Sequence, residues 1–217
     1  MNKEIVLDKN GESNIIFRNT LGVLGAALPI LDAGFNLIFG GSYNAPGVLT
    51  SISATYYSAA FVFFVGIVFA TGVFLIIYRG YDVADRRVSR TAGIGALVLV
   101  LFPCKFDLGE TRNFMMLLQD VTNVFHLAGA LVFFGALIVM IVFQFTKTNE
   151  LKPTGRKLAR NILYVCMGFI MFMSLAVGFG GAALYGWRYS VFFGEWAALW
   201  AFSTAYLTKG GVILKDL

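Results

Sequence analysis

Seven polar side chains of this sequence lie within or at the edges of long apolar stretches. They are two acids, two serines, two tyrosines and the only histidine: Asp32, Ser51, Ser53, Tyr56, Tyr57, His126 and Glu195. A polar group inside a membrane is costly, so each of these residues requires a partner or a function. Hydroxyls, carboxylates and an imidazole can bind a small polar molecule or a lipid headgroup through hydrogen bonds, or exchange protons.

A catalytic use of these residues requires a nucleophile, a base and an orienting acid. Ser51 or Ser53 with His126 and Asp107 supplies the residue types, but their spacing matches no hydrolase motif. The sequence has no GxSxG, HExxH, GxGxxG or P-loop pattern in the required context. One histidine and two separated cysteines cannot supply the usual zinc ligands. We therefore expect no metal and no cofactor, and leave an enzymatic function as an alternative.

The composition is that of a membrane protein. Of the 217 residues, 58% are hydrophobic and 13% are charged, and the mean hydropathy is +0.76. Soluble domains contain about 25% charged residues and have too little interior to bury this much apolar surface. The length fits one domain over residues 1–217. Cys104 and Cys166 are expected near opposite faces of the membrane, so we expect no disulfide between them.

The apolar stretches predict an all-α membrane protein, built as a bundle of six transmembrane helices. The clearest stretch, Tyr56–Tyr78, contains no charged residue. As a helix it would measure about 34 Å, enough to cross a hydrocarbon core of about 30 Å. Pro103 stops the third stretch, and polar connections separate the others. The expected spans are about 18–40, 55–78, 88–103, 121–146, 161–185 and 191–208.

The basic residues alternate between the connections of these spans. Fourteen of the 17 Lys and Arg residues fall on the side that holds both termini, and three on the other side. Because basic residues collect on the cytoplasmic side of membrane proteins, both termini are expected in the cytoplasm. The net charge of +5 then reflects orientation and contact with anionic lipids. We expect membrane lipids as partners and no nucleic acid.

This topology places the seven polar residues in the outer half of the membrane. The first helix runs outward, which brings Asp32 near its outer end. The second, fourth and sixth helices begin at the outer side with their polar residues. If these side chains face inward, they form a polar outer pocket above an apolar inner half. The candidate ligand-binding residues are therefore Asp32, Ser51, Ser53, Tyr56, Tyr57, His126 and Glu195.

The polar groups also have structural interpretations that require no pocket. Asp32 and Glu195 can form buried salt bridges with Arg112 or Arg188, or hydrogen bonds that lock the first and sixth helices together. The histidine can be a hydrogen-bonded packing residue. The Ser51–Tyr57 cluster can be a helix cap followed by an aromatic belt at the membrane interface.

Small residues four positions apart predict where helices approach one another closely. The second helix has Gly66 and Ala70, and the third has Ala92 and Ala96. The fifth helix has a longer series of such residues: Ser174, Gly178 and Ala182. We expect these residues at helix contacts within one bundle, with a dimer interface as the alternative.

Several short motifs resemble a known family. The run AGIGALVLVLFP (residues 92–103) is followed by a polar connection, then by His126-Leu-Ala-Gly-Ala leading to Phe133 and Phe134. Together with SISATYY and YRGYD at the two ends of the second stretch, it resembles uncharacterised bacterial six-helix membrane proteins grouped as domain of unknown function 998. A more distant likeness is to the DRAM/Sfk membrane proteins. The resemblance covers roughly residues 50–146 and implies six helices in a bacterial inner membrane. It implies no reaction, and the distant group points toward lipid handling.

Three functions fit these observations. The first is a non-enzymatic, multi-pass membrane protein that binds a small molecule or a lipid headgroup in an outer-facing polar pocket. The second is a small-solute or proton-coupled transporter, which requires a polar path to the cytoplasmic side. The third is a membrane-embedded, lipid-modifying enzyme, which requires Ser51 or Ser53 beside a base. A structural or assembly subunit needs no pocket, and the oligomeric state is left open.

Overall fold

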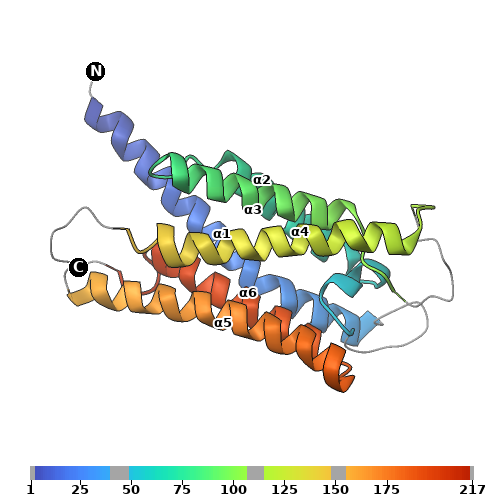
Figure 1. The fold of residues 1–217 in the computed structure, drawn as a ribbon. Helices are drawn as coiled ribbons and strands as arrows, with labels where there is room; N and C mark the ends of the chain where they lie inside the picture. The colour runs from blue at the N-terminus through green and yellow to red at the C-terminus, as the bar shows by residue number, and fades with distance from the viewer. Residues whose placement is uncertain (1–2, 40–48, 107–114, 148–154, 216–217) are drawn as a thin grey trace.

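The computed structural model describes residues 3–39, 49–106, 115–147 and 155–215. Over these ranges the chain forms six α-helices and two short irregular helices (Figure 1). The α-helices lie side by side along one long axis, with α1 running diagonally across the others. Their bounds are α1 Lys3–Phe39, α2 Phe61–Ile77, α3 Val83–Leu101, α4 Gln119–Val139, α5 Gly155–Tyr185 and α6 Ser190–Lys209. A 3₁₀ helix, η1 (Ser53–Tyr57), precedes α2, and a π-helical turn, η2 (Met140–Gln144), continues α4.

Within the residues that the structure describes, three helices are long and apolar enough to cross a membrane. These segments are Asn14–Phe39 and Gln119–Gln144, of 26 residues each, and Gly155–Tyr185, of 31 residues. At 1.5 Å per residue, even the shorter ones measure about 39 Å, more than a hydrocarbon core of about 30 Å. Large apolar side chains on α4 and α5 are exposed, including Leu131 at 76% and Leu184 at 78%. Such a surface indicates a membrane protein, because water solvates it poorly.

The second apolar stretch differs from the predicted span of about 55–78. The α-helix begins only at Phe61, so α2 has 17 residues and a length of about 26 Å. The chain before it turns through η1, and Ser58 then adopts an extended conformation with φ −131° and ψ 174°. All five residues of η1 are buried. The hydroxyl-rich start of this stretch is therefore packed into the bundle instead of capping α2.

Facing glycines set the closest helix contacts. A Cβ added to Gly129 of α4 would lie 2.6 Å from the Leu99 backbone N and 3.0 Å from the Gly95 carbonyl of α3. A Cβ on Gly194 of α6 would lie 2.5 Å from the Ser174 carbonyl of α5. Four of the small residues predicted at contacts are confirmed, namely Ala92 and Ala96 on α3 and Ser174 and Gly178 on α5. Ala182 of α5 instead lines a pocket. The prediction for Gly66 is wrong, because this residue is exposed and a Cβ added to it would meet no atom within 4 Å; Gly72 makes the α2–α3 contact instead.

The two ends of the bundle carry different polar groups. Helices α1 and α6 are antiparallel neighbours, and the Ser203 hydroxyl of α6 donates to the Gly22 carbonyl of α1 at 2.6 Å. We call the end that holds η1 and the starts of α4 and α6 the His126 end. The opposite end holds the α2–α3 turn, the start of α5 and the end of α6, and we call it the Lys209 end.

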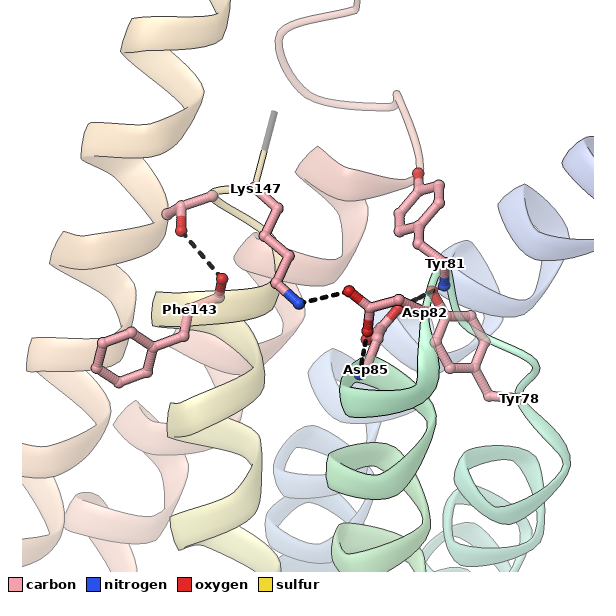
Figure 2. Close-up of polar contacts among 7 residues, drawn as sticks. Tyr78, Tyr81, Asp82, Asp85, Phe143 and Lys147 are labelled. Carbon is pink, nitrogen blue, oxygen red and sulfur yellow. Dashed lines mark hydrogen bonds and ion pairs between the residues drawn. The ribbon is translucent and has the colours of Figure 1, made fainter. Parts of the chain in front are cut away.

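The α2–α3 turn at the Lys209 end is built around two aspartates (Figure 2). Gly80 has φ +62°, a left-handed conformation that favours glycine. Asp82 caps α3 by accepting the Asp85 N–H at 2.8 Å, and its other oxygen lies 2.7 Å from the Lys147 ammonium. The Asp85 N–H and then Lys147 lower the pKa of the Asp82 carboxyl below its ordinary value of 3.8. Asp85 itself is buried, and its carboxylate accepts the Tyr81 N–H at 2.9 Å.

Asp82→Ala is expected to lower the thermal midpoint of unfolding, because the first turn of α3 loses its cap. Asp82→Asn retains a cap oxygen but loses the charge, so its midpoint should lie between those of wild type and Asp82→Ala. Because the pKa of Asp82 is lowered on folding, its stabilisation is present above pH 3.8 and disappears as the pH falls through the lowered pKa. Thermal unfolding of the three proteins at pH 7 and at about pH 3 measures this; a constant difference between wild type and Asp82→Ala contradicts the assignment.

Candidate functional site

A pocket of about 620 Å³ lies at the His126 end. It is bounded by η1, the segment after α3, one face of α4, the last turns of α5 and the start of α6. Four of the seven residues predicted from the sequence line it, and they come from three separate parts of the chain: Ser51, Ser53, His126 and Glu195. Its size is typical of cavities that hold small ligands, which measure about 300–1,000 Å³.

Glu195 holds η1 against α6. Its carboxylate accepts the Ile52 N–H at 2.6 Å, and the Phe192 N–H of α6 donates to the Thr50 carbonyl at 3.1 Å. The first N–H groups of a helix have no partner within it, so a carboxylate from another helix satisfies them here. The sequence interpretation of Glu195 as a partner of Arg112 or Arg188 is thus replaced by a bond to backbone, with Arg112 outside the described residues.

The two serines stabilise the same turn. The Ser51 hydroxyl oxygen accepts the Ala54 N–H at 3.0 Å and lies 3.3 Å from the Ser53 hydroxyl. Ser51 is half-buried and Ser53 is 9% exposed, so both hydroxyls lie at the pocket wall. A short side chain that bonds to backbone three residues later is typical of a capped turn. The hydroxyls therefore shape the polar wall of the pocket.

His126 ties α4 to the end of α3. Its Nδ1 lies 3.0 Å from the Leu99 carbonyl and 2.8 Å from the Phe102 carbonyl. Carbonyl oxygens only accept hydrogen bonds, so Nδ1 carries the proton, and in the neutral ring Nε2 is an acceptor. The last carbonyls of a helix lack partners within it, and His126 satisfies two of them. Nδ1 of His126 therefore has a structural role, whereas the residue also lines the pocket.

Two further residues of α4 hold the segment after α3, and the sequence interpretation missed them. The Asn123 side chain accepts the Lys105 N–H at 2.9 Å, and the Gln119 side chain accepts the Phe106 N–H at 2.9 Å. Gln119, Asn123 and His126 are spaced by four and three residues, which places them on one face of a helix. This spacing of amide and imidazole side chains, close in sequence to the end of the preceding helix, is the sequence pattern from which their role could have been predicted.

Cys104 is buried in the same segment. Its thiol donates to the Ser53 carbonyl at 3.3 Å, and its own carbonyl accepts the Tyr57 hydroxyl at 2.7 Å. Burial raises the pKa of the Cys104 thiol to about 12. The thiol is therefore neutral near pH 7 and is not an activated nucleophile.

Three of the predicted ligand-binding residues lie outside the pocket wall. Tyr56 and Tyr57 are 6% and 4% exposed, and Tyr57 stacks on Phe106 with ring centroids 5.1 Å apart. They support η1 from within the bundle, so neither forms an aromatic belt. Asp32 of α1 is fully buried and lies next to Thr55 of η1. These three side chains are therefore buried in the bundle and do not line the pocket.

The pocket combines a polar end with apolar walls. Lys105 and Arg188 lie at its polar side, where the Lys105 ammonium pairs with Asp120 at 2.7 Å. Its walls include Leu127 of α4 and Phe179 of α5, which are 46% and 44% exposed. The cavity therefore offers hydrogen-bonding groups at one end and apolar surface between α4 and α5.

The catalytic arrangement considered from the sequence lacks its central contact. The two serine hydroxyls contact η1 and each other, and Nδ1 of His126 bonds to carbonyls. Among the described residues, no hydrogen bond joins either serine to His126. Asp107, the acid of that arrangement, lies outside the described residues.

Comparisons with family models, with curated proteins and with solved structures found no match for this chain.

Proposed function

We propose that the protein is a multi-pass bacterial inner-membrane protein that binds a phospholipid headgroup in an outer-facing pocket at the His126 end. The observation that carries this proposal is the meeting of Ser51, Ser53, His126 and Glu195 at one cavity with apolar walls. A site that is polar at one end and apolar at the other matches a molecule with a headgroup and acyl chains. Sequence resemblance to six-helix bacterial membrane proteins adds to it.

The proposed topology has six spans and two cytoplasmic termini. It is supported by the alternation of basic residues, 14 of 17 on one side, and by the antiparallel order of consecutive α-helices. In this topology α2 is one of the spans although it has only 17 residues. A short helix is tolerated where the bilayer thins locally or where flanking residues reach the interface. The buried η1 adds polar backbone at this depth, which membranes tolerate only inside protein.

The pocket chemistry favours a headgroup that contains both a phosphate and a hydrogen-bond donor. Arg188 provides the positive charge for a phosphate, because the Lys105 ammonium pairs with Asp120. The carboxylate of Glu195, the serine oxygens and the acceptor nitrogen of His126 can bind an ammonium or hydroxyl group. Phosphatidylethanolamine and phosphatidylglycerol both have this combination.

A test fills the pocket without changing its charge. Ala182→Leu adds volume at the α5 wall, whereas Ala176→Leu makes the same change on the exposed side of α5. Phosphatidylethanolamine or phosphatidylglycerol in detergent is expected to raise the thermal midpoint of wild type and of Ala176→Leu. In Ala182→Leu, the lipid concentration that gives half of this stabilisation should rise about tenfold or more, because binding to the native state sets the shift.

Arg188→Gln removes the charge proposed to meet the phosphate. It should weaken stabilisation by both phospholipids and leave the midpoint of the lipid-free protein near wild type, since Arg188 is exposed in a turn. Equal stabilisation of wild type, Ala182→Leu and Arg188→Gln contradicts headgroup binding in this pocket.

A further inference from the structure

A second pocket of about 620 Å³ lies at the Lys209 end, far along the bundle from the first. It is bounded by α1 near Arg18, the α2–α3 turn, the start of α5 and the chain at and after the end of α6. Among the residues that the structure describes, its lining contains no acidic side chain and five basic ones: Arg18, Lys157, Arg160, Lys209 and Lys215.

The Arg18 guanidinium is buried without a carboxylate partner. Arg18 is 4% exposed, its Nη2 donates to the Tyr78 hydroxyl at 2.8 Å, and its Nε makes no hydrogen bond. Its charge lies 4.9 Å from the centre of the Tyr81 ring. Within the ranges that the structure describes, no acid forms an ion pair with it. A buried cation that is held only by neutral groups retains most of its capacity to attract an anion.

Lys209 is held in the same way. Its ammonium donates to the Phe145 carbonyl at 3.0 Å and lies 5.2 Å from the centre of the Tyr81 ring. The Lys157 ammonium donates to the same carbonyl at 3.3 Å. The π-helical turn η2 ends just before Phe145, and this carbonyl at the helix end orients two cations from α5 and α6. Over the described residues, Lys209 also has no carboxylate partner.

Two acids at this end of the bundle, Asp82 and Asp85, make contacts with other groups (Figure 2). The Asp82 carboxylate accepts the Asp85 N–H and pairs with Lys147, which is not a pocket residue. The buried Asp85 carboxylate accepts the Tyr81 N–H at 2.9 Å and the Tyr78 hydroxyl at 3.5 Å. Neither of these two acids lines the pocket, although the charge of Asp85 acts on Lys209.

We propose that this pocket binds a phosphate group that is carried by a larger body, either a phosphorylated lipid headgroup or a soluble phosphorylated compound. Several cations around one cavity are suited to a phosphate, because arginine binds its oxygens in pairs and lysine supplies point charges. The cavity is larger than a single phosphate needs, which leaves space for the group that carries it. This site and the His126 pocket share no residue, so the inference does not rest on the proposed function.

The test replaces two basic residues at the rim of the pocket. A control variant replaces two basic residues outside the pocket. Lys157→Gln/Arg160→Gln changes the α5 side of the pocket, where both residues are half-buried. Arg87→Gln/Arg90→Gln removes the same charge from α3 at the same end, where both residues are exposed and outside the lining. The full-length protein is titrated in neutral detergent at constant ionic strength, and the thermal midpoint is recorded.

Two probes separate the possible sources of the phosphate. One arm adds phosphatidic acid against phosphatidylcholine, and the other adds inorganic pyrophosphate against chloride. We expect stabilisation of wild type and of the α3 variant by one of the two phosphate probes. In the α5 variant, the probe concentration that gives half of the stabilisation should rise about tenfold or more for each charged contact that is lost. Stabilisation by phosphatidic acid alone identifies a lipid headgroup, and stabilisation by pyrophosphate identifies a soluble compound.

Two results overturn the proposal. One is the absence of stabilisation by both probes in wild type. The other is an equal loss in the α5 and α3 variants, which means that general charge attraction, and not the pocket, is responsible. Ala182→Leu serves as an additional control, because it alters the His126 pocket alone and should leave this titration unchanged.

Discussion

Glu195→Ala is expected to lower the free energy of unfolding by about 2–3 kcal/mol. The substitution removes a hydrogen bond to a charged group and leaves a buried N–H without a partner. The Ile52 N–H that Glu195 accepts at 2.6 Å is buried, so removing the carboxylate takes away the partner of a buried donor. Glu195→Gln retains a carbonyl oxygen at the same position and should lose less than half as much. Chemical or thermal unfolding in detergent measures the difference.

The same substitution should release η1, and Cys104 reports this. The Cys104 thiol is 7% exposed and donates to the Ser53 carbonyl of η1. In a Cys166→Ser background, which removes the exposed cysteine, a thiol reagent should label Cys104 at least tenfold faster in Glu195→Ala than in Glu195→Gln. Equal labelling rates, together with equal stability, exclude Glu195 as the residue that holds η1.

Gly129→Ala is the second substitution with a large expected effect, about 3 kcal/mol of destabilisation or failure to fold. The added methyl group meets backbone atoms of Leu99 and Gly95, at 2.6 Å and 3.0 Å, and backbone cannot move aside as a flexible side chain can. The α3–α4 pair would have to separate. This separation also shifts His126, which bonds to the end of α3 from the same helix.

The control for this prediction is on the same helix. Gly135 has no atom within 4 Å of the position where a Cβ would stand. Gly135→Ala is therefore expected to leave stability unchanged or to raise it by about 0.5–1 kcal/mol, because alanine favours a helix over glycine. A measured loss in Gly129→Ala no greater than in Gly135→Ala means that the α3–α4 contact is looser than described.

Much of the helical architecture follows from hydrophobicity and breakers. Pro103 predicts the end of the third span, and α3 ends at Leu101. Likewise, the fifth stretch ends at Tyr185, and the sixth begins after the glycine-containing turn that follows. The start of α2 is not predictable in this way. Residues 51–57 continue an apolar stretch, and the contacts that hold their 3₁₀ turn include a carboxylate 143 positions away.

The site is predictable as a layer and not as a set of contacts. Depth along the helices brings Ser51, Ser53, His126 and Glu195 to one end, and all four line one cavity. Depth alone does not give the direction of a side chain, so it groups Asp32, Tyr56 and Tyr57 with them although these three are buried and do not line the cavity. The basic pocket at the Lys209 end was not predicted from the sequence. Its cations come from separate parts of the chain, and each of them is also explained as a charge that orients the protein in the membrane.

The central claim is that the cavity at the His126 end holds a phospholipid headgroup. An experimental density map of the protein in a bilayer of phosphatidylethanolamine and phosphatidylglycerol tests it most directly. The predicted result is headgroup density within hydrogen-bonding distance of Ser53, His126 or Arg188, with acyl chains between α4 and α5. A map that resolves lipids elsewhere around the bundle, and shows this cavity closed by its own side chains, contradicts the claim.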